Sequence, residues 1–299
     1  MSESAPLSGP VDANAAPRAP ANADGERDVI LRARNVTVGF GDAIILKDLD
    51  LDVYRGEILG FVGGSGTGKS VLMRTILGLT PKRAGTIEVL GIDLDSASDE
   101  ERSHVERNWG VLFQQGALFS SLNVRQNIQV PMREHLNLSQ RLMDELALFK
   151  LDLVGLPRDA AEKFPAELSG GMIKRASLAR ALVLDPEIVF LDEPTSGLDP
   201  IAAAAFDDLT TKLRDTLGLT VYMVTHDLDS LHSTCDRIAV LAEKRVLAAG
   251  TIDEMLAFDH PWVQAYFNGV RGARRGHDGS PGGRAADLRG RDGEGASAG

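Results

Sequence analysis

A glycine-rich segment at residues 63–70, Gly-Gly-Ser-Gly-Thr-Gly-Lys-Ser, carries the strongest chemical signal in the chain. It fits G-x-x-x-x-G-K-[ST], the pattern of a phosphate-binding loop. Glycines permit backbone angles that turn successive N–H groups toward a phosphate, and the helix that follows adds its positive N-terminal end. We expect Lys69 to reach the β- and γ-phosphates and the Ser70 hydroxyl to bind Mg²⁺. The alternative is a glycine-rich turn before a helix, but the strand–loop–helix context favours phosphate binding.

Two carboxylates, Asp192 and Glu193, directly follow an apolar run at residues 188–191. A carboxylate pair at the C-terminal end of a central strand lies beside the phosphate loop in this type of sheet. We expect Asp192 to hold Mg²⁺ through water and Glu193 to act as general base toward the attacking water. His226 follows the apolar strand at residues 220–224, from which its imidazole could reach the γ-phosphate. A lone histidine at a strand end is more often structural, and only its context favours a functional reading.

A third candidate site is the segment Leu-Ser-Gly-Gly-Met at residues 168–172, which precedes a helical run of apolar residues. Ser169 is a good N-cap, so the simplest interpretation is a capped helix. The same geometry, a hydroxyl and two exposed glycine amides at a helix N-terminus, also forms an anion site. Such a site could hold a γ-phosphate that another subunit presents.

Hydrophobic patterning predicts the elements that position these residues. Alternating segments near the start predict antiparallel strands, and apolar runs before the loop and before the carboxylates predict strands buried on both faces. Strands alternating with helices imply an α/β fold with a mainly parallel sheet, and residues 115–182 form a candidate inserted helical lobe. The predicted strands lie at residues 30–38, 49–53, 58–62, 86–90, 188–191, 220–224, 238–241 and 245–248.

Composition narrows the function classes. The 299 residues carry a formal net charge of −11, which argues against nonspecific nucleic-acid binding. Cys235 is the single cysteine, so no intramolecular disulfide can form, and a cytosolic compartment fits this. No segment reaches the roughly 18 uninterrupted apolar residues that are needed to span a bilayer. We therefore expect that a role at the membrane would require docking on a partner.

The two ends of the chain lack hydrophobic periodicity. We expect residues 1–27 and 272–299 to be disordered tails and residues 28–271 to form the folded unit. Near its end, apolar residues at helical spacing within 262–270 predict a helix that packs on the folded unit or on a neighbouring subunit.

The order of these motifs resembles that of ATP-binding cassette (ABC) ATPases. Residues 63–70 are similar to the Walker A loop, 168–172 to the LSGGQ signature with Met172 in place of glutamine, 188–193 to Walker B, and 196–199 to the D-loop. The resemblance implies a P-loop NTPase fold with a RecA-like, mainly parallel sheet, an antiparallel β subdomain and the inserted helical subdomain. It also implies an ATPase that works as a head-to-tail dimer, with each ATP between the Walker A loop of one subunit and the signature of the other.

The resemblance assigns roles residue by residue. Phe40 stands where an aromatic residue commonly stacks on adenine, Gln114 where the Q-loop glutamine links Mg²⁺ to the helical lobe, and His226 where the switch histidine stands. The expected catalytic residues are Glu193, His226 and Lys69, and the expected Mg²⁺ ligands are Ser70, Gln114 and Asp192. The expected ATP contacts are Phe40, Gly63, Gly64, Ser65, Gly66, Thr67, Gly68, Lys69, Ser70, Val71, Gln114, Ser169, Gly170 and Gly171.

Within the family, three strings resemble the ATPases of Mla-type phospholipid transport systems, which pair with MCE proteins. They lie at residues 112–119, 131–135 and 167–175, the last containing the methionine-ended signature. The implied partners are a membrane permease, a second copy of the chain, an MCE-domain protein and a small regulatory subunit, at the cytoplasmic face of the inner membrane. Two alternatives stay open: an importer motor for a polar solute such as an amino acid, and a soluble ABC ATPase outside transport.

Overall fold

A six-stranded sheet lies at the centre of the fold in the computed structural model, which describes residues 27–267. Its strand order is β10-β9-β3-β8-β7-β6, and all neighbours are parallel except the β9–β10 hairpin. The predicted tails and Val270 lie outside the described residues, apart from Arg27, whose guanidinium lies 5.2 Å from the centroid of the Tyr54 ring. The strands of this sheet are β3 (Ile58–Gly63), β6 (Trp109–Leu112), β7 (Ile188–Asp192), β8 (Thr220–Val224), β9 (Arg237–Ala242) and β10 (Arg245–Gly250).

A second, four-stranded sheet of order β2-β1-β4-β5 is antiparallel and packs beside the first. It holds β1 (Val29–Phe40), β2 (Ala43–Tyr54), β4 (Ala84–Val89) and β5 (Ile92–Asp93). The sequence patterns predicted most of these strands, but β5 and β6 and the helix α2 (Asp99–Arg107) were missed. The two strands are short, and α2 has a single buried residue, Val105. None of the three elements therefore leaves a clear periodic signal in the sequence.

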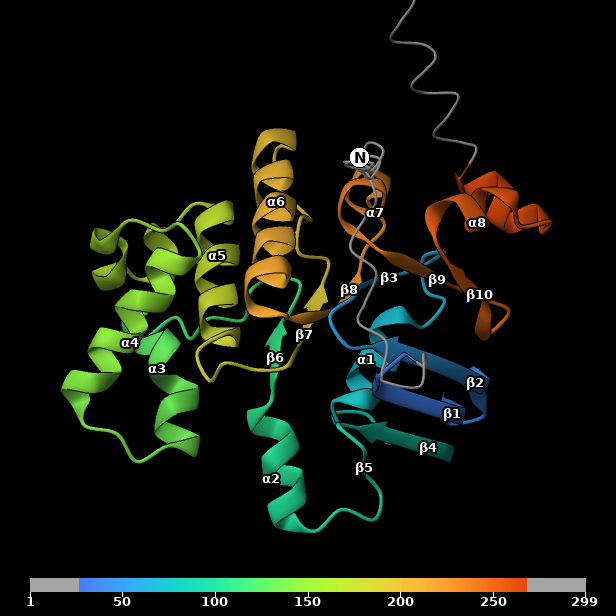
Figure 1. The fold of residues 1–299 in the computed structure, drawn as a ribbon, viewed down its shortest axis with the longest axis horizontal. Coiled ribbons are helices and arrows are strands. Elements are labelled where there is room, and N and C mark those ends of the chain that lie inside the picture. The colour runs from blue at the N-terminus through green and yellow to red at the C-terminus, as the bar shows by residue number, and fades with distance from the viewer. Residues whose placement is uncertain (1–26, 268–299) are drawn as a thin grey trace, which may run out of the picture.

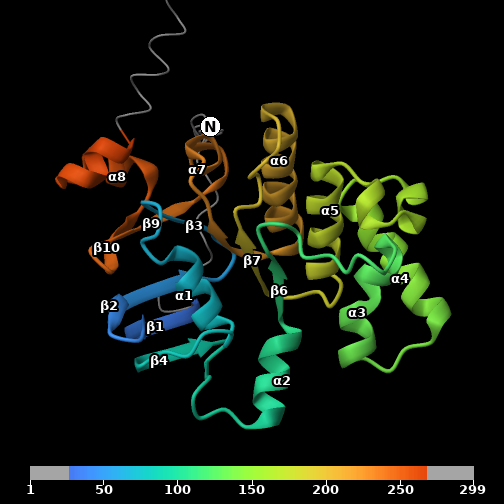
Figure 2. The same ribbon diagram turned by 180° about the vertical axis from the view of Figure 1, so that it is seen from behind.

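The helices α3 (Val124–His135), α4 (Gln140–Leu153) and α5 (Gly170–Ala181) lie together on the side opposite the antiparallel sheet (Figure 1). They occupy the chain between β6 and β7, where the sequence predicts a helical lobe, and the view from behind shows the same separation (Figure 2). Within residues 27–267 no helix is long and apolar enough to cross a membrane. The other helices are α1 (Lys69–Ile76), α6 (Pro200–Leu217), α7 (Leu228–Thr234) and α8 (Ile252–Ala257), and 3₁₀ turns lie at Arg158–Glu162 and Pro165–Glu167.

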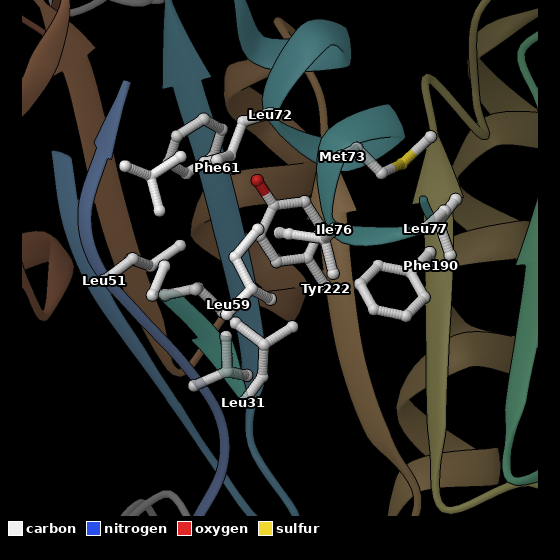
Figure 3. Packing of buried hydrophobic residues seen from close by; sticks show 14 of the residues in the cluster. Leu31, Leu51, Leu59, Phe61, Leu72, Met73, Ile76, Leu77, Phe190 and Tyr222 are labelled. Atoms are coloured by element: carbon white, nitrogen blue, oxygen red, sulfur yellow. The ribbon is translucent and has the colours of Figure 1, made fainter. Parts of the chain in front are cut away.

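The parallel sheet is buried on both faces, and alternate residues of its strands feed two different cores. On one face Phe61, Phe190 and Tyr222 pack with α1 and the antiparallel sheet, and the Tyr222 ring lies 5.5 and 5.6 Å from the other two (Figure 3). On the other face, residues such as Val189 and Met223 pack with α3, α5 and α6. This two-sided burial explains the continuous apolar runs in the sequence and makes the sheet a rigid support for its loops.

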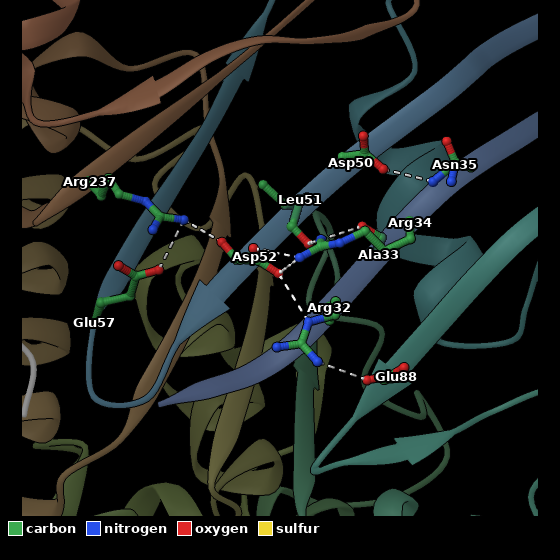
Figure 4. A network of polar contacts seen from close by, with 10 residues as sticks. All are labelled: Arg32, Ala33, Arg34, Asn35, Asp50, Leu51, Asp52, Glu57, Glu88 and Arg237. Carbon is green, nitrogen blue, oxygen red and sulfur yellow. Dashed lines mark hydrogen bonds and ion pairs between the residues drawn. The ribbon is translucent and has the colours of Figure 1, made fainter. Parts of the chain in front are cut away.

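A buried ion-pair network joins the antiparallel sheet to β9 (Figure 4). Glu57 is only 3% exposed, accepts the Tyr54 N–H at 2.9 Å, and lies 3.5 Å from the Arg237 guanidinium. Arg237 in turn donates to the Asp52 carbonyl and lies 4.3 Å from the centroid of the Tyr54 ring. Burial raises the pKa of Glu57 to about 7, although Arg237 opposes the shift. The carboxyl group is therefore more easily protonated in the folded chain than in the unfolded one.

Stability should consequently depend on pH through Glu57. Because the pKa of Glu57 is raised in the folded chain, its proton stabilises the fold fully at pH values below 4.5, the ordinary pKa of the group. This stabilisation is lost as the pH rises through about 7. We expect the free energy of unfolding of the wild type to fall, relative to that of Glu57→Gln, by at most about 3 kcal/mol between these limits. Urea unfolding of both proteins from pH 4.5 to 8 measures this difference. A difference that stays constant across the range would show that burial does not shift this group.

Candidate nucleotide site

The parallel register brings the ends of four strands to one edge of the sheet. Leu112 pairs with Leu191, Asp192 pairs with Val224, and Phe61 also pairs with Val224. Side chains just beyond these pairs must meet, because the carboxyl ends of parallel strands share an edge. The residues two positions beyond a paired one are Gly63, Gln114, Glu193 and His226.

The glycine-rich loop lies between β3 and α1, as predicted. Gly66 and Gly68 adopt left-handed angles, φ +73° and +108°, and Gly68 is the N-cap residue of α1. A Cβ atom on Gly68 would lie only 2.9 Å from Ile45 and Leu46 of β2. Glycine is therefore required both for the turn and for close packing under β2, and the loop directs the N-terminus of α1 outward.

Lys69 turns its ammonium group into this loop. Its Nζ donates hydrogen bonds to the carbonyl oxygens of Gly63, at 2.8 Å, and Gly64, at 3.0 Å. Burial lowers the pKa of Lys69, while the carboxylates of Glu193 and Asp192 oppose the shift. The cation thus lies between the loop backbone and the two carboxylates, which is the position needed to contact a bound phosphate.

Asp192 is the last residue of β7 and is 3% exposed. Its Oδ1 accepts a hydrogen bond from the Ser70 hydroxyl at 3.1 Å. Burial is the largest influence on the Asp192 carboxyl and raises its pKa, against the effect of this bond. A buried carboxylate beside a hydroxyl is an oxygen donor set that suits Mg²⁺, and an ion there would offset the burial of the charge.

Glu193 adopts a left-handed backbone conformation, φ 50°, which is uncommon for a residue with a side chain. Its N–H donates to the Val224 carbonyl at 2.8 Å, so the end of β8 fixes this turn. The carboxylate Oε2 lies 2.7 Å from Nδ1 of His226, so the two side chains are in direct contact. The Glu193 side chain is 13% exposed and that of His226 67% exposed, so His226 lies on the solvent side of a mostly covered carboxylate.

Three other predicted residues lie outside the glycine-rich loop. Gln114 is exposed two residues beyond β6, and Val71 is half-buried on the first turn of α1. Phe40 ends β1 beside the β1–β2 turn and is 55% exposed, so its ring is available for stacking. Ser65 and Thr67 belong to the loop itself, where the Thr67 hydroxyl donates to the Gly64 carbonyl at 2.9 Å.

The signature residues lie on a different part of the molecule, at the start of α5, which both views place apart from α1 (Figures 1 and 2). Ser169 is the N-cap and accepts the Met172 N–H at 3.3 Å. A Cβ atom on Gly171 would meet nothing within 4 Å, and one on Gly170 would meet only Leu198, at 3.8 Å. Crowding within the described chain therefore does not require glycine here, and the helix end is open to a group from outside.

A helical segment at residues 261–267 also reaches the loop, a contact that the sequence did not reveal. It packs on β9 and α8 through Val263 and Phe267. A Cβ atom on Gly64 would lie 3.9 Å from the Trp262 indole, which stacks on Tyr266 at 4.9 Å. The predicted apolar helix thus packs on its own chain in its described part, and it places one of only two tryptophans beside the phosphate loop.

Comparison with known proteins identifies the family. The profile described as ABC transporter matches residues 46–196. A Mycobacterium leprae protein named probable ribonucleotide transport ATP-binding protein mkl is 39% identical over 243 residues, 81% of this chain and 70% of its own. The intermembrane phospholipid transport system ATP-binding protein MlaF of Haemophilus influenzae is 39% identical over 227 residues, 76% of this chain and 86% of its own. The Escherichia coli K12 MlaF is 37% identical over 237 residues, 79% and 88% of the two chains.

Solved structures agree. A dimeric post-hydrolysis state of the ATP-binding cassette MJ0796, bound to ADP and Pi, has a TM-score of 0.68 and 30% identity and covers 74% of this chain and 98% of its own. The cbiO1 protein of Clostridium perfringens, part of a cbiONQ ABC transporter complex, has a TM-score of 0.70 and 28% identity, covering 84% and 98%. The predicted fold class is thereby confirmed. The chain belongs to the ABC transporter family, and it is an ATP-binding cassette ATPase.

Proposed function

We propose that this chain is the ATP-hydrolysing motor of an Mla-type phospholipid transport system, bound at the cytoplasmic face of the inner membrane. The observation that carries the proposal is the similarity to two MlaF proteins over 86% and 88% of their lengths. The strings at residues 112–119, 131–135 and 167–175 support the same subgroup. The relative named as a probable ribonucleotide transporter favours a second candidate, a motor for a polar solute.

The residues at the sheet edge fit ATP with Mg²⁺. The loop at residues 63–70, with Val71 behind it, would hold the phosphates through backbone N–H groups, and Phe40 would stack on adenine. Ser70, Asp192 and Gln114 would hold Mg²⁺, which supplies positive charge to the phosphate oxygens when it is bound. Lys69 would exchange its bonds to Gly63 and Gly64 for phosphate oxygens.

Glu193 would act as general base. Its carboxylate is placed at the edge of the sheet by the fixed backbone turn, and it would accept a proton from the attacking water. His226 would donate from Nδ1–H to this carboxylate and from Nε2–H to a γ-phosphate oxygen. Lys69 would stabilise the charge that develops on the phosphoryl oxygens.

The active unit would be a head-to-tail dimer. Ser169, Gly170 and Gly171 are open to the outside, and a helix N-terminus with free amides binds an anion well. The γ-phosphate of ATP on the partner chain has the required charge. One chain would therefore supply half of each catalytic site, and the dimeric state of the similar cassette MJ0796 supports this arrangement.

A permease helix would dock in a groove between the loop after β6 and α3. The groove has a volume of about 500 Å³, and its apolar walls include Phe113, Phe119 and Pro131. Phe119 is 52% exposed, which leaves an aromatic side chain ready for a partner. Since the groove begins next to Gln114, docking there would connect the nucleotide site with the membrane partner. An MCE-domain protein and a small regulatory subunit would complete the assembly.

Trp262 offers a direct test of the nucleotide site. In a Trp109→Phe background it is the sole tryptophan, and its contact with the loop at Gly64 predicts that ATP changes its fluorescence. Adding Lys69→Ala should weaken this response and abolish hydrolysis, because the phosphates lose their cation. ATP binding measured by equilibrium dialysis serves as the control. Unchanged Trp262 emission at saturating ATP, or wild-type turnover of Lys69→Ala, would contradict the assignment.

Glu193→Gln tests the base and the dimer together. Glutamine keeps the contact with His226 but cannot accept the proton, so ATP should be bound and retained. We expect an ATP-dependent dimer in light scattering and loss of nearly all hydrolysis. Adding Ser169→Arg should restore the monomer without abolishing ATP binding by a single chain. If Glu193→Gln stays monomeric with ATP and Mg²⁺, Glu193 does not have the proposed role.

The transport role is tested by purifying the full-length chain with its membrane partner. We expect a permease to co-purify and phospholipid vesicles to stimulate ATP hydrolysis by the complex, whereas ribonucleotides and amino acids should not. Phe119→Glu should release the permease because it places a charge in the apolar groove, while Phe149→Glu, on exposed α4, should not. Stimulation by a polar solute alone would favour the second candidate, and absence of any membrane partner would favour a cassette outside transport.

A further inference from the structure

Lys174 occupies an unusual position for a lysine. It lies in the second turn of α5, on the face that packs against the sheet, and is only 5% exposed. Its neighbours on this helix face include Ser177 and Leu178, which are also buried. A buried ammonium group is costly unless it is paired and hydrogen-bonded, so its contacts should explain its presence.

Those contacts join two loops of the catalytic edge. The Lys174 Nζ donates to the backbone carbonyl of Gln114 and, at 2.8 Å, to the backbone carbonyl of Glu193. Burial lowers the pKa of Lys174, and the carboxylates of Asp192 and Glu193 oppose the shift. One side chain therefore connects α5, the loop after β6 and the loop after β7.

The contact with Glu193 fixes the backbone that aims the proposed base. At φ 50°, Glu193 holds a left-handed conformation that is strained for a residue with a side chain and persists only where its surroundings fix it. The Glu193 N–H donates to the Val224 carbonyl at 2.8 Å. The Glu193 carbonyl accepts from the Lys174 ammonium group and, at 3.2 Å, from the Ser196 N–H. The peptide groups on both sides of the Glu193 Cα are thus held, which sets the direction of the carboxylate.

The other contact belongs to a row along α5. Arg180, six residues further, donates to the carbonyls of Gly116, at 2.8 Å, and Ala117, at 2.7 Å. A Cβ atom on Gly116 would lie 2.6 Å from the Ser177 hydroxyl, between these two cations. The loop after β6 is therefore held closely along one face of α5, and Lys174 alone in this row also reaches Glu193.

We propose that Lys174 is a positioning residue that transmits the state of the N-terminal end of α5 to Glu193 of the same chain. The inference rests on the proposed function, in which Ser169 at that end contacts ATP held by the partner chain. Lys174 lies five residues after Ser169 on one rigid helix, so a shift of α5 on the partner's ATP moves the Glu193 carbonyl directly. In this way each chain's base responds to the nucleotide on the other chain.

The test compares Lys174→Met, which keeps the length of the stem but loses the donors, with Lys174→Arg, which keeps the charge and the donors. In the full-length chain we expect Lys174→Met to lower kcat on the order of tenfold to a hundredfold, as small displacements of catalytic groups do, with the Kd for ATP unchanged. The dependence of the rate on ATP concentration should lose its cooperativity. Lys174→Arg should recover most of kcat, and Lys212→Met, exposed on α6, should match the wild type.

Three outcomes would overturn the inference. Lys174→Met could turn over ATP like the wild type, or it could lose ATP binding and kcat in parallel. Alternatively, Lys174→Met and Lys174→Arg could lose kcat equally while their Tm falls equally, which indicates a purely structural role. Failure of the proposed dimer is distinguishable, because Glu193→Gln would then stay monomeric with ATP and Mg²⁺, whatever the kcat of the Lys174 variants.

Discussion

The parallel hydrogen bonding of β3, β8, β7 and β6 is the constraint on which the rest of the molecule depends. Because these strands run in the same direction and in register, each delivers its following loop to the same edge. The phosphate loop precedes both carboxylates and His226 by more than a hundred residues in the sequence, yet the fold brings these groups together. A one-residue slip in any strand would turn its core residues to the wrong face and misplace its loop.

The two faces of this sheet pack against different parts of the chain. One face packs α1 and the antiparallel sheet, which shape the phosphate loop, while the other packs α5 and α6 of the helical side. In the proposed function, the sheet thereby separates the part that would hold nucleotide from the part that would meet partners. Side chains that cross between the parts, such as Lys174, are the physical route by which one part can influence the other.

The sequence predicted the fold class and the residues at the sheet edge because each signal is local. A glycine loop between a buried strand and a helix, or carboxylates that end an apolar run, can be read within ten residues. β6 was missed because its four residues begin with Trp109 and Gly110 and show no alternation. The contacts of Lys174 and Trp262 could not be predicted, since they depend on how α5 and the segment 261–267 pack against distant loops.

The open N-terminal end of α5 has a consequence for cells that carry both a normal and a defective copy of this chain. If its glycines serve the neighbour's nucleotide, a chain with a small change at this end, such as Ser169→Ala, would still pair but would impair the site of a normal partner. When normal and altered chains pair at random, the mixed dimers also lose ATP hydrolysis. The total loss then exceeds the share of altered chains. Alleles that change this helix end should therefore behave as dominant inhibitors, whereas alleles that prevent folding should be recessive.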